Sequence, residues 1–220
     1  RAVRPELDEA AARLEAARAL RRGATKGPLI PSIGAQASLG GLGGTTGVFH
    51  FSANATSPDY KLAGPNTSIT LPVSLALDEA RDLLVANAFG GTVALFSPGQ
   101  TGDQFPVRTF SPGGNTQSIA YGNAAILLGT GSTIDQYPFT ASGSATASAQ
   151  IGNPISYTGG IYMDTDVTPP VLYVADFSGN AIHIIQTVGV APFLTVGTVT
   201  TITGPSTGLT SPYGVLVVKV

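Results

Sequence analysis

The stretch GPNTSITLPVSLALD, residues 64–78, decides the fold, because the chain repeats it as GPSTGLTSPYGVLVV at residues 204–218. The glycine, proline and threonine positions, and the aliphatic positions that follow, coincide without a gap. Both copies read as a tight turn followed by a short apolar strand. The chain therefore contains at least two copies of one β-rich unit.

A second pair of segments repeats in the same way. LLVANAFGGTV (83–93) and LYVADFSGNAI (172–182) share an apolar run, then Asn87 or Asp176, then a glycine-containing turn and a second apolar run. This order predicts a β-hairpin in each unit. The tight turns at Gly90-Gly91 and Gly179-Asn180 suit a backbone with positive φ.

A weaker third copy, SIAYGNAAILLGTGSTI, occupies residues 118–134. The landmarks Asp78, Tyr121 and Asp164 then recur at intervals of 43 residues. A period of 40–50 residues with about four short strands per unit is typical of a propeller blade. The sequence predicts an all-β protein with the β-propeller fold.

Strands within the first unit can be placed directly. They are predicted, from the inner to the outer edge of the blade, at residues 73–77, 83–88, 92–97 and 106–110. The apolar runs of the inner strands leave no room for charged residues, as expected for strands buried on both faces.

The two ends of the repeat complement each other. Residues 47–64 match the third and fourth strands of a blade, and residues 204–220 supply an inner strand. A second strand would come from residues 32–42, and joining the ends gives one composite closing blade. Three further blades are predicted at residues 64–110, 111–151 and 152–203, which makes four; five blades, or an open part of a larger ring, are the alternatives.

An amphipathic α-helix is predicted before the propeller. Residues 5–22 are rich in Ala, Leu, Glu and Arg, and Gly23 is suited to end the helix. We therefore divide the chain into residues 1–26, a helix with the start of a linker, and residues 27–220, the propeller. The helix is expected to dock on a partner or to continue a longer helix.

Composition limits the partners and the location. Residues 27–220 hold four basic side chains against nine acidic ones, too few for the phosphate contacts of a nucleic-acid-binding protein. No apolar run is long enough to span a membrane. The chain has no cysteine and only 11% charged residues. The absence of cysteine does not assign a compartment, but the low charge together with abundant Ser, Thr, Gly and Asn favours an exported protein, extracellular or at the cell surface, with the periplasm as an alternative.

The repeated units resemble NHL/YVTN-type β-propeller repeats of bacterial secreted and surface proteins. The resemblance is carried by GPNT…LPVSLALDEARDLLVAN…GTVALFSPG, by GPST…SPYGV and by LYVADFSGNAI, and it covers about 170 residues. It implies a fold rather than an activity, because these motifs are structural. The predicted helix at 5–22 lies outside it.

The residues needed for known propeller chemistries are scarce. In residues 27–220, Arg81 and Arg108 are the only arginines that could bind a carboxylate, and Glu79 is the only Glu. The chain has no Trp to stack on a quinone cofactor. His50 and His183 fall in third strands, away from the propeller axis. We therefore predict no enzymatic activity, no cofactor and no catalytic residues.

No metal site is predicted either. Asp164 and Asp166 provide two carboxylates in one loop, which is fewer oxygen ligands than calcium requires. An Asx-turn is the preferred interpretation of this loop.

A binding surface is predicted where the turns between second and third strands gather with the crossovers between blades. Phe89 and Phe177 occupy equivalent turn positions among Asn, Thr and Asp residues, and exposed aromatic side chains are enriched in contact surfaces. The predicted ligand-binding residues are Asn87, Phe89, Thr130, Asp176, Phe177 and Asn180. The ligand is a protein or a glycan.

Three functions remain open from the sequence. The first is an exported, non-catalytic propeller that acts as a binding or scaffold domain. The second is a structural subunit of a surface filament or pilus-like appendage, with the N-terminal helix as its truncated shaft. The third is a propeller enzyme.

Overall fold

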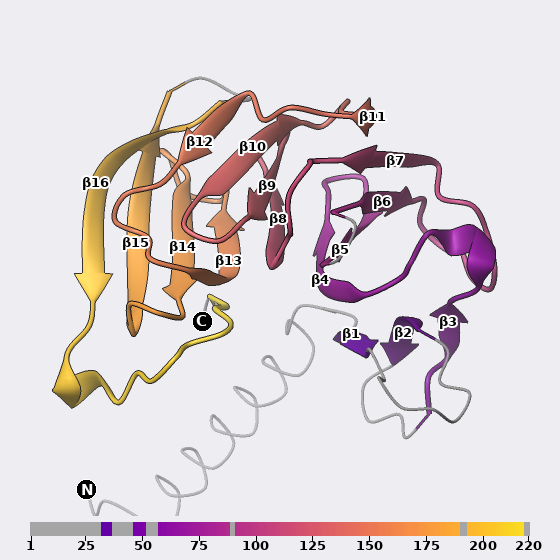
Figure 1. Cartoon of the computed structure of the whole chain (residues 1–220), viewed down its shortest axis with the longest axis horizontal. Helices are drawn as coiled ribbons and strands as arrows, with labels where there is room; N and C mark the ends of the chain where they lie inside the picture. Colours follow the sequence, from indigo (N-terminus) through magenta and orange to yellow (C-terminus); the bar gives the residue numbers. More distant parts are fainter. Residues whose placement is uncertain (1–31, 37–45, 52–56, 89–90, 190–192, 218–220) are drawn as a thin grey trace, which may run out of the picture. The chain divides into compact units, whose positions relative to one another are not determined.

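A computed structural model describes residues 32–36, 46–51, 57–88, 91–189 and 193–217, and these ranges form four β-sheets (Figure 1). The elements in chain order are β1 (Ser32–Gln36), β2 (Gly47–Phe51), β3 (Tyr60–Leu62), η1 (Pro65–Thr67), β4 (Pro72–Leu77), β5 (Leu83–Asn87), β6 (Val93–Phe96), β7 (Arg108–Ser111), β8 (Ser118–Gly122), β9 (Ala125–Gly129), β10 (Ile134–Pro138), β11 (Gly143–Ser144), β12 (Ala149–Ile151), β13 (Thr158–Asp164), β14 (Val171–Asp176), β15 (Ala181–Val188), β16 (Thr195–Ile202) and η2 (Pro205–Thr207).

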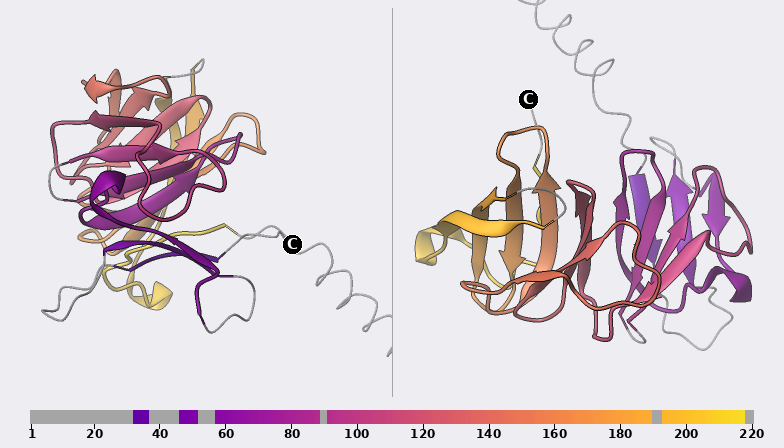
Figure 2. Two further views of the ribbon diagram at one scale, coloured as in Figure 1. Left: turned by 90° about the vertical axis from the view of Figure 1, so that its right-hand side faces the viewer. Right: turned by 90° about the horizontal axis from the view of Figure 1, so that it is seen from above.

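Each sheet is made almost entirely of strands that are consecutive in the chain. The orders are β1-β2-β3, β4-β5-β6-β7, β8-β9-β10-β12 and β13-β14-β15-β16. The exception is β11, which leaves the third sheet and pairs in parallel with β7. The first strands β4, β8 and β13 of successive sheets lie next to one another, as in a propeller (Figure 2).

The hydrophobic core lies between successive sheets. Leu84 on one face of β5 packs in a cluster with Ile126 of the next sheet. Val85, on the other face of β5, packs with Val48 and Leu62 of the first sheet. Because alternate residues of one strand face two cores, the strand is apolar throughout, which explains the continuous apolar runs in the sequence.

The strands predicted in the first unit are confirmed. Residues 73–77, 83–88, 92–97 and 106–110 correspond to β4, β5, β6 and β7, with ends that differ by at most two residues. The all-β class is also confirmed. The structure does not test the number of blades in a closed ring, so four blades stays a prediction.

The predicted composite closing blade is not formed. Strands β1, β2 and β3 occur where they were expected, but residues 208–217 form no strand and this sheet takes no strand from them. The segment instead lies against the start of β13, where a Cβ on Gly159 would fall 2.6 Å from the Pro212 carbonyl oxygen.

The turn that precedes this segment is nevertheless repeated in detail. Thr67 Oγ1 donates to the Gly64 carbonyl at 2.8 Å in η1, and Thr207 Oγ1 donates to the Gly204 carbonyl at 2.7 Å in η2. The repeated sequence therefore reproduces the local turn, whereas the strand after it also needs a partner edge to pair with.

Some predictions lie outside the described residues, namely the N-terminal helix at 5–22, the domain boundary between 26 and 27, and Phe89. Within the described ranges, no helix is long and apolar enough to cross a membrane.

Candidate functional site

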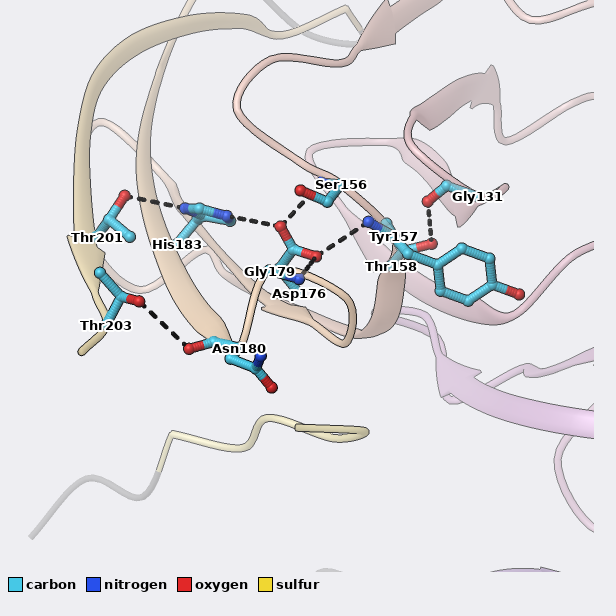
Figure 3. A network of polar contacts seen from close by, with 10 residues as sticks. All are labelled: Gly131, Ser156, Tyr157, Thr158, Asp176, Gly179, Asn180, His183, Thr201 and Thr203. Atoms are coloured by element: carbon cyan, nitrogen blue, oxygen red, sulfur yellow. Dashed lines mark hydrogen bonds and ion pairs between the residues drawn. The ribbon is translucent and has the colours of Figure 1, made fainter. Parts of the chain in front are cut away.

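A buried carboxylate fixes the turn after β14 (Figure 3). Asp176 is 1% exposed and accepts hydrogen bonds from the backbone N–H groups of Ser156 at 2.8 Å, Tyr157 at 2.9 Å and Gly179 at 2.9 Å. It also lies 3.2 Å from His183 Nε2. One side chain thus joins the β14–β15 turn to the segment that enters β13.

The hydrogen bonds keep this carboxylate charged. Burial by itself raises the pKa of Asp176, but the donors from Ser156, Tyr157, Gly179 and His183 together outweigh it, so that the pKa lies below the ordinary value for aspartate. The second ring nitrogen of His183, Nδ1, lies 3.0 Å from Thr201 Oγ1 in β16. Asp176, His183 and Thr201 therefore connect strands β14, β15 and β16 through their side chains.

Three aromatic rings surround a hollow beside this network. The ring centroids of Tyr157 and Phe177 are 6.2 Å apart at an interplanar angle of 63°, and those of Phe177 and Tyr213 are 6.1 Å apart at 88°. Together with Ser178 they line a hollow of about 280 Å³. We call these four residues the aromatic site.

The rings of the aromatic site are accessible to solvent. Tyr157 is 38% exposed, Phe177 37% and Tyr213 60%. Edge-to-face contacts of this kind are favourable, but they leave ring faces free. A buried, rigid base therefore carries an exposed aromatic surface.

Each ring is positioned by a different segment. The Phe177 N–H donates to the Tyr157 carbonyl at 2.8 Å, which fixes those two residues to each other. Gln117 Nε2 donates to Tyr157 Oη at 3.0 Å, and Gln117 Oε1 accepts from the Gly131 N–H at 2.7 Å. The phenol of Tyr157 is thus tied to the turn of the neighbouring sheet.

Tyr213 lies on the segment after η2. The Ser211 N–H donates to Asn180 Oδ1 at 2.7 Å, which ties this segment to the β14–β15 turn. The close approach to β13 depends on two glycines, since a Cβ on Gly160 would fall 2.9 Å from the Gly214 Cα. Any side chain at Gly159 or Gly160 would push the segment away.

The structure brings three of the six predicted ligand-binding residues together in one turn, places Asn87 and Thr130 elsewhere, and does not describe Phe89. Asp176, Phe177 and Asn180 share the β14–β15 turn, whereas Asn87 ends β5 in another sheet. Thr130 lies in the β9–β10 turn, where its hydroxyl lies 3.0 Å from that of Thr133.

The ligand contacts predicted for Asn87 and Asp176 stay a prediction, but the structure gives both side chains another role. Asn87 is fully buried, and its Oδ1 accepts from the Thr70 and Leu71 N–H groups at 3.0 and 3.2 Å. Its Nδ2 group donates to the Ser68 carbonyl at 3.0 Å. Like Asp176, it ties its turn to the segment entering the first strand, and its polar atoms are committed to that task.

Sequence reasoning missed two of the three rings. Tyr213 occupies the position that Val73 holds in the first copy of the repeat, and this replacement of an aliphatic residue by an aromatic one was an available signal. Nothing in the sequence pattern distinguished Tyr157.

A larger hollow of about 670 Å³ lies beside the third sheet, under the segment 144–150. Its walls are mainly Ser, Thr and Ala, and Tyr137 at its base is 1% exposed. Burial, and to a lesser extent the Asp135 carboxylate, raises the pKa of Tyr137 to about 12. The described residues that line this hollow include no exposed aromatic side chain, and the one charged group among them is Asp135. The Asp135 carboxylate already accepts hydrogen bonds from Thr130, Thr133 and Gln150. We therefore favour the aromatic site as the candidate binding site.

The predicted Asx-turn at the aspartate pair is confirmed. The Asp166 N–H donates to Asp164 Oδ1 at 3.0 Å. Over the described residues, no group of three or more His, Asp or Glu side chains is placed to hold a metal ion.

The sequence matches none of the protein-family models and none of the curated proteins with which it was compared. Solved structures do match. A protein from Bacteroides fragilis assigned as a 6-phosphogluconolactonase has a TM-score of 0.53 at 16% identity, over 74% of this chain and 51% of that one. Myxococcus xanthus glutaminyl cyclase gives 0.47 at 14% identity over 64% and 57%, and the WD40 β-propeller domain of Doa1 gives 0.41 at 17% over 56% and 38%.

These likenesses show a β-propeller-like fold, and the chain spans about half the length of the first structures named. They do not show the NHL repeat type. They also correct one prediction: the expectation that the chain is not an enzyme is contradicted, because the solved structure with a TM-score of 0.53 is that of a protein assigned as a 6-phosphogluconolactonase.

Proposed function

We propose that this propeller-like chain binds a ligand through the aromatic site. The observation that carries the proposal is the convergence of Tyr157, Phe177 and Tyr213 from three separate segments around one exposed hollow. The buried Asp176 network beneath them holds the backbone at Tyr157 and the turn that carries Phe177, so that these two residues lose little conformational entropy on binding.

The exposed rings set the scale of the affinity. With aromatic side chains of roughly 150–250 Å² each, the three exposed fractions leave on the order of 200–300 Å² of ring surface open to water. Covering all of it would contribute about 5–7 kcal/mol. Association itself costs at least about 4 kcal/mol, so we expect a Kd no tighter than about 1 to 10 mM for a ligand that contacts only this site.

A screen by saturation-transfer NMR tests the proposal. Wild-type protein would be exposed to a mixed panel of soluble oligosaccharides, short peptides and small metabolites, and each binder would be re-tested on Phe177→Ala. Phe105→Ala is the matched control, because Phe105 is 71% exposed and lies outside the aromatic site. We expect binding to be lost in the first variant and kept in the second. Binders that are indifferent to Phe177→Ala would contradict the proposal.

We also propose that the repeats are of the NHL/YVTN type and that the protein works outside the cytoplasm, at the cell surface or in the periplasm. The quoted repeats and the low charge support this. An antibody against residues 27–220, applied to fractions of the source cells, tests the location. Detection in the cytosolic fraction alone would contradict it.

A further inference from the structure

We infer that the ligand of the aromatic site is an uncharged carbohydrate. This inference rests on the proposed function and names the chemical class of the ligand. Three properties of the site lead to it: the arrangement of the rings, the absence of charge and the polar groups at the rim.

The arrangement of the rings suits a small, flat ligand with apolar faces. Phe177 lies between Tyr157 and Tyr213, with interplanar angles of 63° and 88°, so that the three rings form walls of different orientation. The hollow of about 280 Å³ is at the small end of ligand pockets. A pyranose ring presents C–H groups on its faces and can pack against such a wall, burying apolar surface without a charge.

Among the described residues, the lining of the site offers no charged group that could balance a charged ligand. Its four lining residues are two tyrosines, a phenylalanine and a serine. The one carboxylate close to it, Asp176, is 1% exposed and faces backbone N–H groups instead of the hollow. Burying a phosphate, sulfate or uronic acid here without a cation would cost several kcal/mol, which argues against charged ligands.

The rim of the site carries groups that suit hydroxyls. Tyr157 Oη accepts from Gln117 and can still donate, while Ser178 and Tyr213 each bring a hydroxyl. Asn180 Oδ1 accepts from the Ser211 N–H, and Asn180 Nδ2 donates to none of the described residues. Apolar walls with a rim of neutral donors and acceptors match the alternation of C–H faces and hydroxyl edges on a sugar.

A proline-rich peptide is the main competitor, since such peptides dock on aromatic surfaces in an extended conformation. They need a groove several residues long. The aromatic site is instead a hollow lined by four residues. The observations therefore favour a carbohydrate.

Isothermal titration of the full chain with defined probes tests the inference. The probes are neutral hexasaccharides of glucose (α- and β-linked), mannose, xylose and galactose, a hexamer of galacturonic acid, and a proline-rich decapeptide. We expect at least one neutral hexasaccharide to bind. Phe177→Ala and Tyr213→Ala should each weaken that binding at least tenfold, Tyr213→Phe should weaken it less than threefold, and Phe105→Ala should leave it unchanged. The galacturonic acid hexamer should bind at least ten times more weakly than the best neutral probe.

The outcomes separate this inference from the proposed function. Preferential binding of the galacturonic acid hexamer or the peptide, lost in Phe177→Ala, would overturn the carbohydrate assignment and leave the aromatic site as a binding site. Failure of every neutral hexasaccharide to bind would also overturn the assignment. Binding of a neutral hexasaccharide that survives both alanine substitutions would overturn the location, and with it the proposed function.

Discussion

Replacing Asp176 with asparagine removes one oxygen acceptor from a site that receives four donors. In the wild type, Oδ2 faces the Ser156 N–H and His183 Nε2, and Oδ1 faces the N–H groups of Tyr157 and Gly179. An asparagine keeps one oxygen and places an NH₂ group where the other was. Two donors then face each other in a site that is 1% exposed.

The loss of stability follows from counting hydrogen bonds. If the new NH₂ group takes the place of Oδ2, His183 can change tautomer, accept a hydrogen bond from the NH₂ group and donate to Thr201. The hydrogen bond between residues 176 and 183 is then kept. The Ser156 N–H has no such remedy. It loses a charge-assisted bond and stays buried without a partner, which together cost roughly 2–4 kcal/mol. For a chain of this length the melting temperature should fall by roughly 4–15 °C.

The pH dependence identifies the carboxylate as the cause. Because the folded pKa of Asp176 lies below its ordinary value, its stabilising contribution is present above the unfolded pKa of about 3.9. It is lost as the pH falls through the folded pKa. Urea unfolding followed by circular dichroism should therefore show a large gap between wild type and Asp176→Asn at pH 7 and a smaller gap in acid.

The control is Asp78→Asn, which removes the same charge from a half-buried site. Asp78 Oδ1 accepts only the Asp82 N–H at 2.8 Å, a bond that asparagine can keep. We expect this variant to stay within about 0.5 kcal/mol of wild type. If Asp176→Asn were no less stable than Asp78→Asn at pH 7, the reasoning from the buried network would be refuted.

Three further predictions concern single contacts. Gly159→Ala places a Cβ 2.6 Å from the Pro212 carbonyl oxygen, so it should displace the segment that carries Tyr213. We expect ligand binding to weaken at least fivefold with little change in the β-sheet circular dichroism. Unchanged titration data would contradict this. Ser118→Ala should be neutral or stabilising by up to about 1 kcal/mol in urea unfolding, because the buried Ser118 hydroxyl has no hydrogen-bond partner among the described residues. If the variant is less stable by about 1 kcal/mol, the hydroxyl must have a partner and the prediction is wrong. The pKa of Tyr137 is about 12 in the folded state and about 10 in the unfolded state, so the free energy of unfolding should fall as the pH rises from 10 towards 12. In Tyr137→Phe this pH dependence should be weaker. Equal slopes of the free energy of unfolding against pH in both proteins would contradict the prediction.

The sequence allowed the sheets to be predicted because their signals are local and repeated. Strand β5 is apolar at every position up to Asn87, since Leu84 and Val85 face different cores, and this shows directly in the sequence. The equivalence of Asn87 and Asp176 was also visible. Their role was not, because it depends on backbone N–H groups that lie 16 to 20 residues earlier and come within reach only in the folded sheet.

The candidate site was only partly predictable. Phe177 was found because it follows Asp176 in a repeated turn. Tyr157 and Tyr213 are far apart in the chain, and they line the same hollow because Gly159 and Gly160 allow the C-terminal segment to approach β13. Two adjacent glycines at the start of a strand are a sign of close backbone approach, but they do not say which segment approaches.

The wrongly predicted closing strand bears on the site as well. Residues 215–218 are rich in valine and favour a strand, yet a strand forms only where another edge is available, and sequence repetition cannot supply that edge. The hydrogen bond from Ser211 to Asn180 and the approach to Gly159 hold the segment in place instead. Tyr213 is consequently the most exposed of the three rings and the one with the fewest anchors. A ligand that stacks on it would add the contacts that this segment does not obtain from a sheet, so binding and ordering of the segment should be coupled.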